Sequence, residues 1–210
     1  PKREIKRIKE LLDRICSGGK TAAPGFKRIY RAAKVEECTV DTQYVLSGEH
    51  DADIMKIIRA IVAAEEPISV RFLTKRTLAT LGIFKFGVKL EGKISSLIDK
   101  CALRHEEILG ATYYFRTDKF GSFDRYRVEE NTALRTSDAY YAAYDVISAI
   151  KSVLLSKVSM YADELAVAVQ REFKVPRLSD KFAAFINSCI DYGVSKGIFV
   201  RSISDKISMV

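Results

Sequence analysis

Several residue patterns that mark common protein classes are missing from this sequence of 210 residues. No apolar run approaches the roughly 18 residues that a membrane-spanning helix needs, and no signal-peptide pattern opens the chain. The sequence has only two histidines and four widely spaced cysteines (Cys16, Cys38, Cys101 and Cys189), without a Cys-x-x-Cys pair. We therefore expect a cytoplasmic protein without a zinc site, in which Cys101 and Cys189 are small buried side chains on helices.

Signatures of catalysis are missing as well. There is no Gly-x-x-x-x-Gly-Lys-Ser/Thr phosphate-binding motif, no nucleophile signature and no cluster of acidic metal ligands at nuclease spacing. His105 lies next to Glu106, but neighbours along a strand point to opposite faces, so the two do not form part of a catalytic triad. We expect no enzymatic activity and no cofactor in this chain.

What the sequence does have is an uneven excess of positive charge. The formal net charge is +8, and residues 1–35 carry 11 basic against 3 acidic residues, which equals the whole excess. Residues 51–128 contain 14 basic and 10 acidic residues, whereas residues 138–210 contain 9 and 8. A basic protein favours nucleic acid as a partner, and here the charge lies mainly in the N-terminal part.

The chain also carries an internal repeat, with a constant shift of 92 positions from Asp53 to Asp145. At this shift apolar residues coincide: Ile54 with Val146, Ile58 with Ile150, Leu73 with Leu165, Leu81 with Phe173, Leu90 with Phe182, and Ile94 with Ile186. Most positions that we expect to be exposed differ between the copies. Such self-similarity indicates a duplicated small domain.

Each repeat predicts three helices followed by two short strands. Helical periodicity predicts first helices over 52–64 and 140–156, second helices over 70–81 and 161–173, and third helices over 87–101 and 179–192. Gly82 is expected as a left-handed C-cap and Ser179 as an N-cap. Strand-like runs follow at 106–109 and 112–115, and at 198–200 and 206–209. The expected fold is mainly α with small β-hairpins (α+β), arranged as tandem winged helix-turn-helix repeats.

Five regions follow from this reading. Residues 1–17 are expected to form an amphipathic helix at the end of a preceding domain, and residues 18–50 a partly extended connector from which Tyr44 and Val45 pack onto the first repeat. Residues 51–128 are the first winged-helix repeat, 129–137 a linker, and 138–210 the second repeat.

The candidate nucleic-acid-binding residues are basic and lie on the third helix, the turn before it and the wing. In the first repeat, Lys85, Lys89 and Lys93 are spaced by four, which predicts one cationic helical face. The wing region adds Arg116, Lys119, Arg125 and Arg127 among aromatic residues, and the second repeat offers Lys174, Arg177 and Lys181. The alternative for these residues is a solvated helix face and a hairpin that packs on its own core.

Several short segments carry a family resemblance. Five segments resemble an uncharacterised C-terminal domain of large bacterial superfamily I-type DNA/RNA helicases: Tyr30-Arg31-Ala32-Ala33, Glu65-Glu66-Pro67-Ile68, Lys75-Arg76, Leu81-Gly82-Ile83 and Gly87-Val88-Lys89-Leu90. In that family the domain often follows a segment like very-short-patch-repair endonucleases, and residues 1–15 are similar to the end of that segment. The resemblance implies a parent protein that is an ATP-dependent helicase with a nuclease segment.

Two functions are compatible with these patterns. One is a noncatalytic accessory module that binds DNA through the phosphate backbone, mainly with the first repeat. The other is a docking module that contacts a protein, such as the helicase body of the parent chain, without touching nucleic acid. The near-neutral second repeat favours docking, and neither reading involves a membrane.

Overall fold

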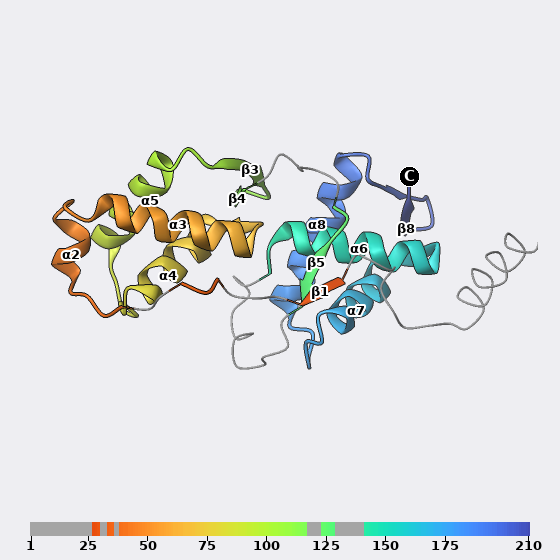
Figure 1. Ribbon diagram of the computed structural model, residues 1–210. Coiled ribbons are helices and arrows are strands. Elements are labelled where there is room, and N and C mark those ends of the chain that lie inside the picture. The colour runs from red at the N-terminus through yellow and green to blue at the C-terminus, as the bar shows by residue number, and fades with distance from the viewer. Residues whose placement is uncertain (1–26, 30–32, 36–37, 117–122, 129–140) are drawn as a thin grey trace, which may run out of the picture. The chain divides into compact units, whose positions relative to one another are not determined.

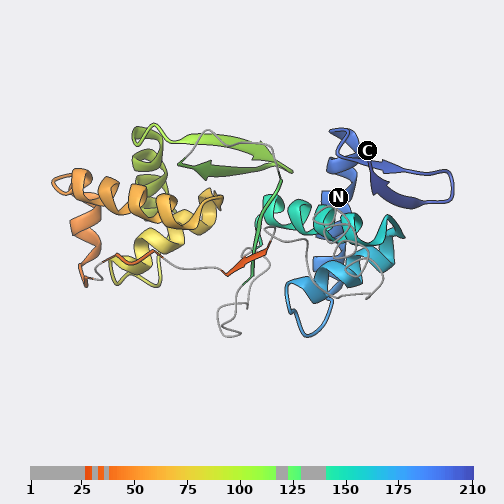
Figure 2. The same ribbon diagram turned by 45° about the vertical axis from the view of Figure 1, so that its right-hand side comes forward.

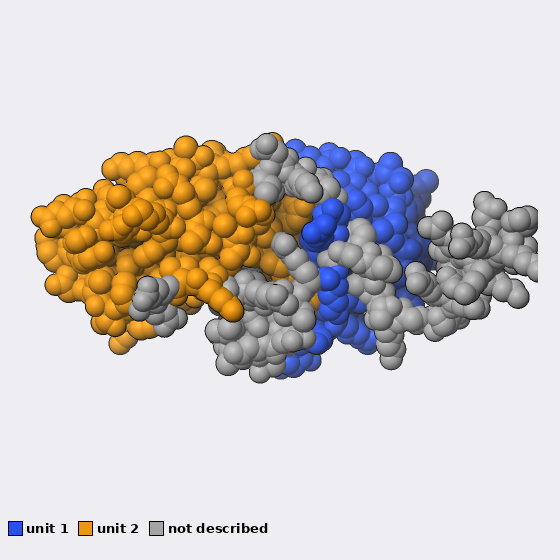
Figure 3. Space-filling view, viewed as in Figure 1, with its two compact units in different colours: residues 1–28, 124–126, 147–210 blue, residues 29–123, 127–146 orange. Residues whose placement is uncertain are grey.

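The computed structural model describes residues 27–29, 33–35, 38–116, 123–128 and 141–210, which form helices and small antiparallel sheets in a mixed α+β fold (Figure 1). The expected helix over 1–17, the linker over 129–137 and Lys119 lie outside the described residues. The chain divides into two compact units (Figure 3). Unit 1 contains residues 1–28, 124–126 and 147–210, and unit 2 contains residues 29–123 and 127–146.

Six elements of unit 2 follow one another as helix, strand, helix, helix, strand, strand. They are α3 (Asp51–Glu65), β2 (Ile68–Ser69), α4 (Val70–Thr80), α5 (Val88–Lys100), β3 (Arg104–Ile108) and β4 (Ala111–Phe115). The antiparallel sheet has the order β2-β4-β3, so that Tyr114 of the central strand pairs with Ile68 on one side and His105 on the other. We call these six elements the first set.

The same order of elements occurs again, and we call it the second set. It consists of α6 (Ala143–Lys157), β6 (Ser159–Tyr161), α7 (Ala162–Glu172), α8 (Asp180–Ser195), β7 (Phe199–Arg201) and β8 (Lys206–Met209), with sheet order β6-β8-β7. Each of the three helices starts 92 residues after its counterpart in the first set. The expected helices are confirmed, with ends that differ by at most three residues.

The constant shift ends after the third helix. α8 has 16 residues where α5 has 13. In the hairpins, His105 pairs with Tyr114, nine positions later, whereas Arg201 pairs with Ile207, six positions later. Compared with the first set, the second set has three more residues in its third helix and three fewer between the paired positions of its hairpin. Figure 2 shows both hairpins as antiparallel arrows.

Local signals explain where the helices begin and end. The Ser69 side chain accepts a hydrogen bond from the Phe72 N–H at the start of α4, and Ser179 accepts one from Phe182 at the start of α8, which confirms the N-cap expected there. Gly82 follows α4 with φ of +75°, which confirms the expected left-handed position. A Cβ at Gly82 would lie 3.0 Å from the Thr39 backbone, so the neighbouring chain also requires glycine here.

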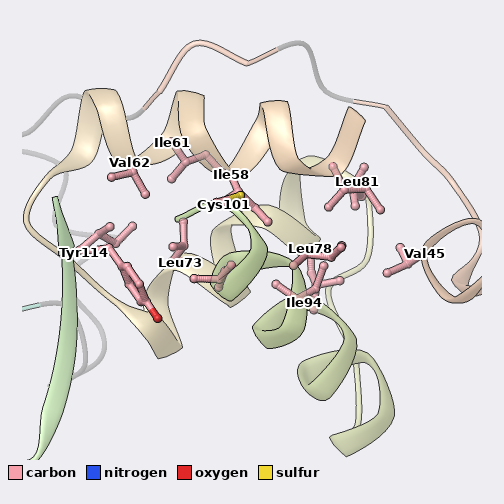
Figure 4. Packing of buried hydrophobic residues seen from close by; sticks show 14 of the residues in the cluster. Val45, Ile58, Ile61, Val62, Leu73, Leu78, Leu81, Ile94, Cys101 and Tyr114 are labelled. Atoms are coloured by element: carbon pink, nitrogen blue, oxygen red, sulfur yellow. The ribbon is translucent and has the colours of Figure 1, made fainter. Parts of the chain in front are cut away.

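The core of the first set lies between its three helices and the inner face of the sheet. Figure 4 shows Ile58 and Ile61 of α3 packed against Leu78 of α4, Ile94 of α5 and their neighbours. α2 (Thr42–Leu46), a helix in the expected connector, adds the fully buried Val45. The expected packing of Tyr44 and Val45 onto this core is confirmed, but the local structure is helical because Asp41 caps Tyr44 N–H at 2.8 Å.

Unit 1 has a separate core that is rich in aromatic residues. Phe173 makes edge-on contacts with Phe182 and with Tyr126, at ring-centroid distances of 6.4 and 5.6 Å. Tyr126 lies on β5 (Tyr126–Val128), which pairs with β1 (Lys27–Ile29). β1 falls in the connector that we expected to be partly extended, and β5 falls at the end of the expected first repeat. The Tyr126 hydroxyl donates to Glu172 at 2.7 Å. Burial is the main cause that raises the pKa of Tyr126, and this hydrogen bond is the second cause.

Candidate nucleic-acid interface

The solvent-facing side of α5 follows from which of its residues are buried. Leu90, Ile94, Leu97 and Ile98 pack into the core, so the opposite side, with Val88 and Lys89 in the first turn, faces outward. Val88 is 84% exposed, and Phe84 in the preceding turn is 78% exposed. The start of α5 therefore presents large apolar side chains together with cations.

Lys85 and Lys89 are the cations of this surface. α5 begins at Val88, so Lys85 lies in the turn between α4 and α5, and only Lys89 lies on the helix. Both are exposed. The backbone N–H groups of the first helical turn add positive potential beside them, which attracts anions such as phosphate.

Lys93 differs from its two neighbours in the sequence. Its ammonium lies 2.7 Å from the carboxylate of Asp51 in the first turn of α3, and its side chain is only 21% exposed. Lys100 lies 3.8 Å from the same carboxylate. The predicted face of three lysines on one helix therefore does not form, because Lys85 precedes the helix and Lys93 is held against α3.

An open groove of about 540 Å³ runs between α4 and α5 on this side of the first set. It is lined by Val70, Arg71, Thr74, Val88, Glu91, Gly92 and Ser95. Arg71 and the neighbouring Lys75 are exposed cations on α4 that the sequence analysis did not single out. Their signal was available, because both follow the cap at Ser69 at positions that do not belong to the apolar stripe.

We give the name α4–α5 face to six exposed residues of α4, the following turn and the start of α5: Arg71, Lys75, Phe84, Lys85, Val88 and Lys89. Of these, Arg71 and Val88 line the groove. The face combines four exposed cations with two exposed apolar side chains. In the sequence, Phe84 directly precedes Lys85, and Val88 directly precedes Lys89. Glu91 is the acidic residue at the groove. The face can accept anionic groups through the lysines and arginine, and planar or apolar groups against Phe84 and Val88.

The predicted wing cations are dispersed. Arg116 follows β4 at the base of the hairpin, whereas the exposed tip is formed by Leu109 and Gly110 and is followed by no lysine or arginine until Arg116. Arg125 is exposed but belongs to unit 1. Of the predicted wing cations that the structure describes, none lies at the tip of the β3–β4 hairpin.

Arg127 is a structural residue of unit 2. Its guanidinium donates to Oδ2 of Asp145 at 2.5 and 3.0 Å and to Oδ1 at 3.3 Å, and it also donates to the carbonyl oxygens of Glu65 and, at 2.6 Å, Pro67. Its side chain is 10% exposed and that of Asp145 is 4% exposed. The prediction that Arg127 offers its charge to a nucleic acid is wrong in physical terms, since its guanidinium points inward to protein oxygens.

The second set repeats part of the α4–α5 face. At the shift of 92, Arg177 corresponds to Lys85 and Lys181 to Lys89; both are exposed, as is Lys174 after α7. Phe185 replaces Lys93, and Asp180 replaces the exposed Val88. Two cations around the start of the third helix are thus common to both sets, while the apolar element is found only in the first.

Two of the reactive groups in the described part of the chain are buried thiols. Cys101 and Cys189 are buried, as expected, and burial raises the pKa of both thiols; for Cys101 the Arg59 guanidinium acts in the opposite direction. Within the described ranges, no three His, Cys, Asp or Glu side chains gather as they would around a metal ion. Among the described helices, none has the length and apolar character needed to cross a bilayer.

Comparisons of the chain with protein-family models and with curated proteins found no match.

Proposed function

We propose that this chain is a noncatalytic nucleic-acid-binding module built from two winged helix-turn-helix domains, and that the first set contacts the phosphate backbone. The order of six elements and the sheet order, found twice, support the winged-helix assignment. In such domains the third helix and the turn before it approach the nucleic acid. The resemblance to helicase C-terminal domains supports an accessory role in a cytoplasmic bacterial protein.

The observation that carries the proposal is the exposed pair Lys85 and Lys89 at the start of α5. Lysines that face solvent are available to neutralise phosphate groups. When they do so, the counterions condensed on the nucleic acid are released. The matching Arg177 and Lys181 of the second set give the module a second backbone contact of the same kind. Binding of this type is tolerant of sequence and depends steeply on salt.

The proposal is tested by replacing the pair and measuring binding over a range of salt concentrations. Lys85→Gln with Lys89→Gln should weaken duplex binding at low salt by about tenfold or more, and lower the slope of log K against log salt by about two. The matched control is Lys34→Gln with Lys56→Gln, which removes two other exposed cations of unit 2. Equal loss in both variants, or no binding by the unaltered chain, would contradict the proposed face.

The same assay distinguishes the kinds of nucleic acid. Duplex, single-stranded and forked substrates of equal length are compared at one salt concentration. A preference for duplex supports insertion of α5 into a groove, whereas a preference for single strands supports stacking of bases on Phe84.

A second candidate function is docking to a protein partner, such as the helicase body of the parent chain. It is favoured by Phe84 and Val88, which together place two large apolar side chains in water. Phe84→Ser with Val88→Ser should then abolish binding to that body while duplex affinity changes little. If nucleic-acid binding is lost instead, the apolar residues belong to the nucleic-acid interface.

A further inference from the structure

Three arginines from three separate segments meet at a cavity at the base of the first hairpin. Arg59 comes from α3, Arg104 from the start of β3, and Arg116 from the residue after β4. The cavity has a volume of about 300 Å³, and its other lining residues are Val62, Ala63, Ala102, Leu103 and Phe115. Because β3 and β4 pair from Arg104–Phe115 to Ile108–Ala111, this cavity lies at the opposite end of the hairpin from its tip.

The cavity is also distinct from the α4–α5 face. Lys89 lies in the first turn of α5, whereas Ala102, Leu103 and Arg104 follow its last residue, Lys100. A helix of 13 residues is about 20 Å long at 1.5 Å per residue. The positive charge of the first set is therefore divided between the two ends of α5.

The lining concentrates positive charge over an apolar floor. None of the described residues that line the cavity is acidic. The Glu66 carboxylate reaches this region through Oε2, which accepts the backbone N–H of Arg116 at 2.6 Å. Val62 and Phe115 are buried, and an apolar floor strengthens the attraction between the guanidinium groups and an anion.

The fold itself does not require these three arginines. In the second set, Lys151 stands at the position of Arg59 by the shift of 92. The sheet registers, which pair Arg104 with Phe115 and Val200 with Ser208, place Val200 at the position of Arg104 and Met209 at that of Arg116. The second set forms the same six elements with one cation in place of three, so this order of elements does not depend on the three arginines.

We propose that Arg59, Arg104 and Arg116 bind a phosphate monoester. A monoester carries up to two negative charges and three terminal oxygens, and arginine bonds such oxygens in a bidentate manner. Three guanidinium groups exceed what a single carboxylate can use. A volume of about 300 Å³ is at the lower end of small-ligand sites, which leaves room for the phosphate and the group next to it.

Two sources of a phosphate monoester fit this chemistry, a small phosphorylated metabolite and the 5′ end of a nucleic-acid strand. The probes are therefore inorganic phosphate, a 5′ mononucleotide, and two duplexes that differ only in a 5′ phosphate or a 5′ hydroxyl. Affinities are measured with the full chain at constant ionic strength. The site variant is Arg59→Gln with Arg116→Gln, and the matched variant is Lys85→Gln with Lys89→Gln, which removes the same charge from the α4–α5 face.

We expect the chain to bind at least one monoester probe about tenfold more tightly than its hydroxyl counterpart, the nucleoside or the 5′-hydroxyl duplex. The site variant should abolish this ratio, and the lysine variant should keep it, while circular dichroism shows that both are folded. Preference for the phosphorylated duplex alone identifies strand ends, and equal preference for the mononucleotide identifies a metabolite.

A ratio near one in the unaltered chain, or the same ratio in the site variant, overturns the proposal. Failure of the nucleic-acid function appears differently, as an unchanged affinity for the 5′-hydroxyl duplex in the lysine variant. If the site variant does not fold, Arg59→Lys with Arg116→Lys keeps the charge but loses the bidentate geometry. That variant should lose most of the ratio, and retention of the full ratio contradicts an arginine-specific site.

Discussion

The two sets share an order of elements but differ in what lies on the outer face of the sheet. In the first set, Tyr113 and Phe115 occupy that face and are buried; the Tyr113 hydroxyl accepts the N–H of Ala143 at 3.1 Å, and Phe115 contacts Tyr144 edge-on. The corresponding residues of β8, Lys206 and Ser208, are polar and partly exposed. The same scaffold thus supports a covered sheet in one set and an open sheet in the other.

Buried charge is distributed in the same unequal way. Unit 2 holds Arg127 with Asp145, and also the fully buried Glu65, which accepts bonds from Arg76 at 3.0 and 3.1 Å and from the Ala33 N–H at 2.9 Å. At the shift of 92, Glu65 corresponds to the exposed Lys157 and Arg76 to Ala168. The duplication of apolar positions therefore conserves the core, while the contacts of Glu65 with Arg76 and Ala33 have no counterpart at the equivalent positions of the second set.

The sharpest way to test this comparison is to remove the acid of the buried pair. Asp145→Ala leaves the Arg127 guanidinium buried without its carboxylate, and breaking such a pair costs about 3 kcal/mol or more. Chemical denaturation should show the loss in the transition of unit 2. The control is Asp53→Ala, because Asp53 occupies the equivalent position but is exposed beside Lys56; an equal effect of both substitutions would show that burial of Asp145 is unimportant.

A smaller effect is expected where a helix of the second set touches its hairpin. A Cβ at Gly193 of α8 would lie 2.2 Å from the Phe199 ring, so Gly193→Ala should destabilise unit 1 by about 1–3 kcal/mol through overpacking. At the shift of 92, Cys101 of the first set corresponds to Gly193. Cys101 follows the last residue of α5, whereas Gly193 lies within α8, because α8 is three residues longer.

Gly92 provides the opposite control for this substitution. It lies inside α5, and a Cβ added there would meet no neighbouring atom within 4 Å, so Gly92→Ala should stabilise by about 0.5–1 kcal/mol through helix propensity alone. Thermal unfolding of the two variants gives the signs. If both alanines stabilise, the contact between α8 and Phe199 is looser than described.

A destabilisation smaller than that of Asp145→Ala is expected at the covered sheet. Tyr113→Phe removes the hydroxyl that accepts the Ala143 N–H and should cost about 1–2 kcal/mol, because the buried donor loses its partner. Tyr161→Phe, on the open sheet of the second set, keeps the ring below the Lys206 ammonium and should leave the unfolding midpoint unchanged. A similar loss in both variants would contradict the difference between the two sheets.

The helices were predictable because two copies of one apolar pattern restrict each other. Ile54, Ile58 and Ile61 repeat at helical spacing, and Val146, Ile150 and Val153 repeat the pattern 92 residues later. The short elements α2, β1 and β5 were missed because three to five residues show no period. Their formation depends on partners elsewhere in the chain, such as Glu172 for Tyr126.

The candidate site was predictable only for residues whose place in it depends on exposure to solvent alone. Lys89 is exposed because it lies outside the apolar stripe of α5, and Lys85 is exposed in the turn before that helix. Local spacing could not reveal that Lys93 meets Asp51, 42 positions away, or that Arg127 meets carbonyl groups about 60 positions away. A usable signal did exist for Arg127, since Asp145 interrupts an otherwise apolar first turn, where a buried acid requires a cation.

The pairing of Arg127 with Asp145 has a consequence for how a duplicated chain evolves. Asp145 belongs by sequence to the second set and by packing to unit 2, while its counterpart Asp53 faces water. If both sets descend from one ancestral unit, the acid at this position has come to two different environments since the duplication, exposed at Asp53 and buried at Asp145. From that point the first set relied on a residue encoded after the linker, so deletion of the second copy would no longer restore a self-sufficient ancestor.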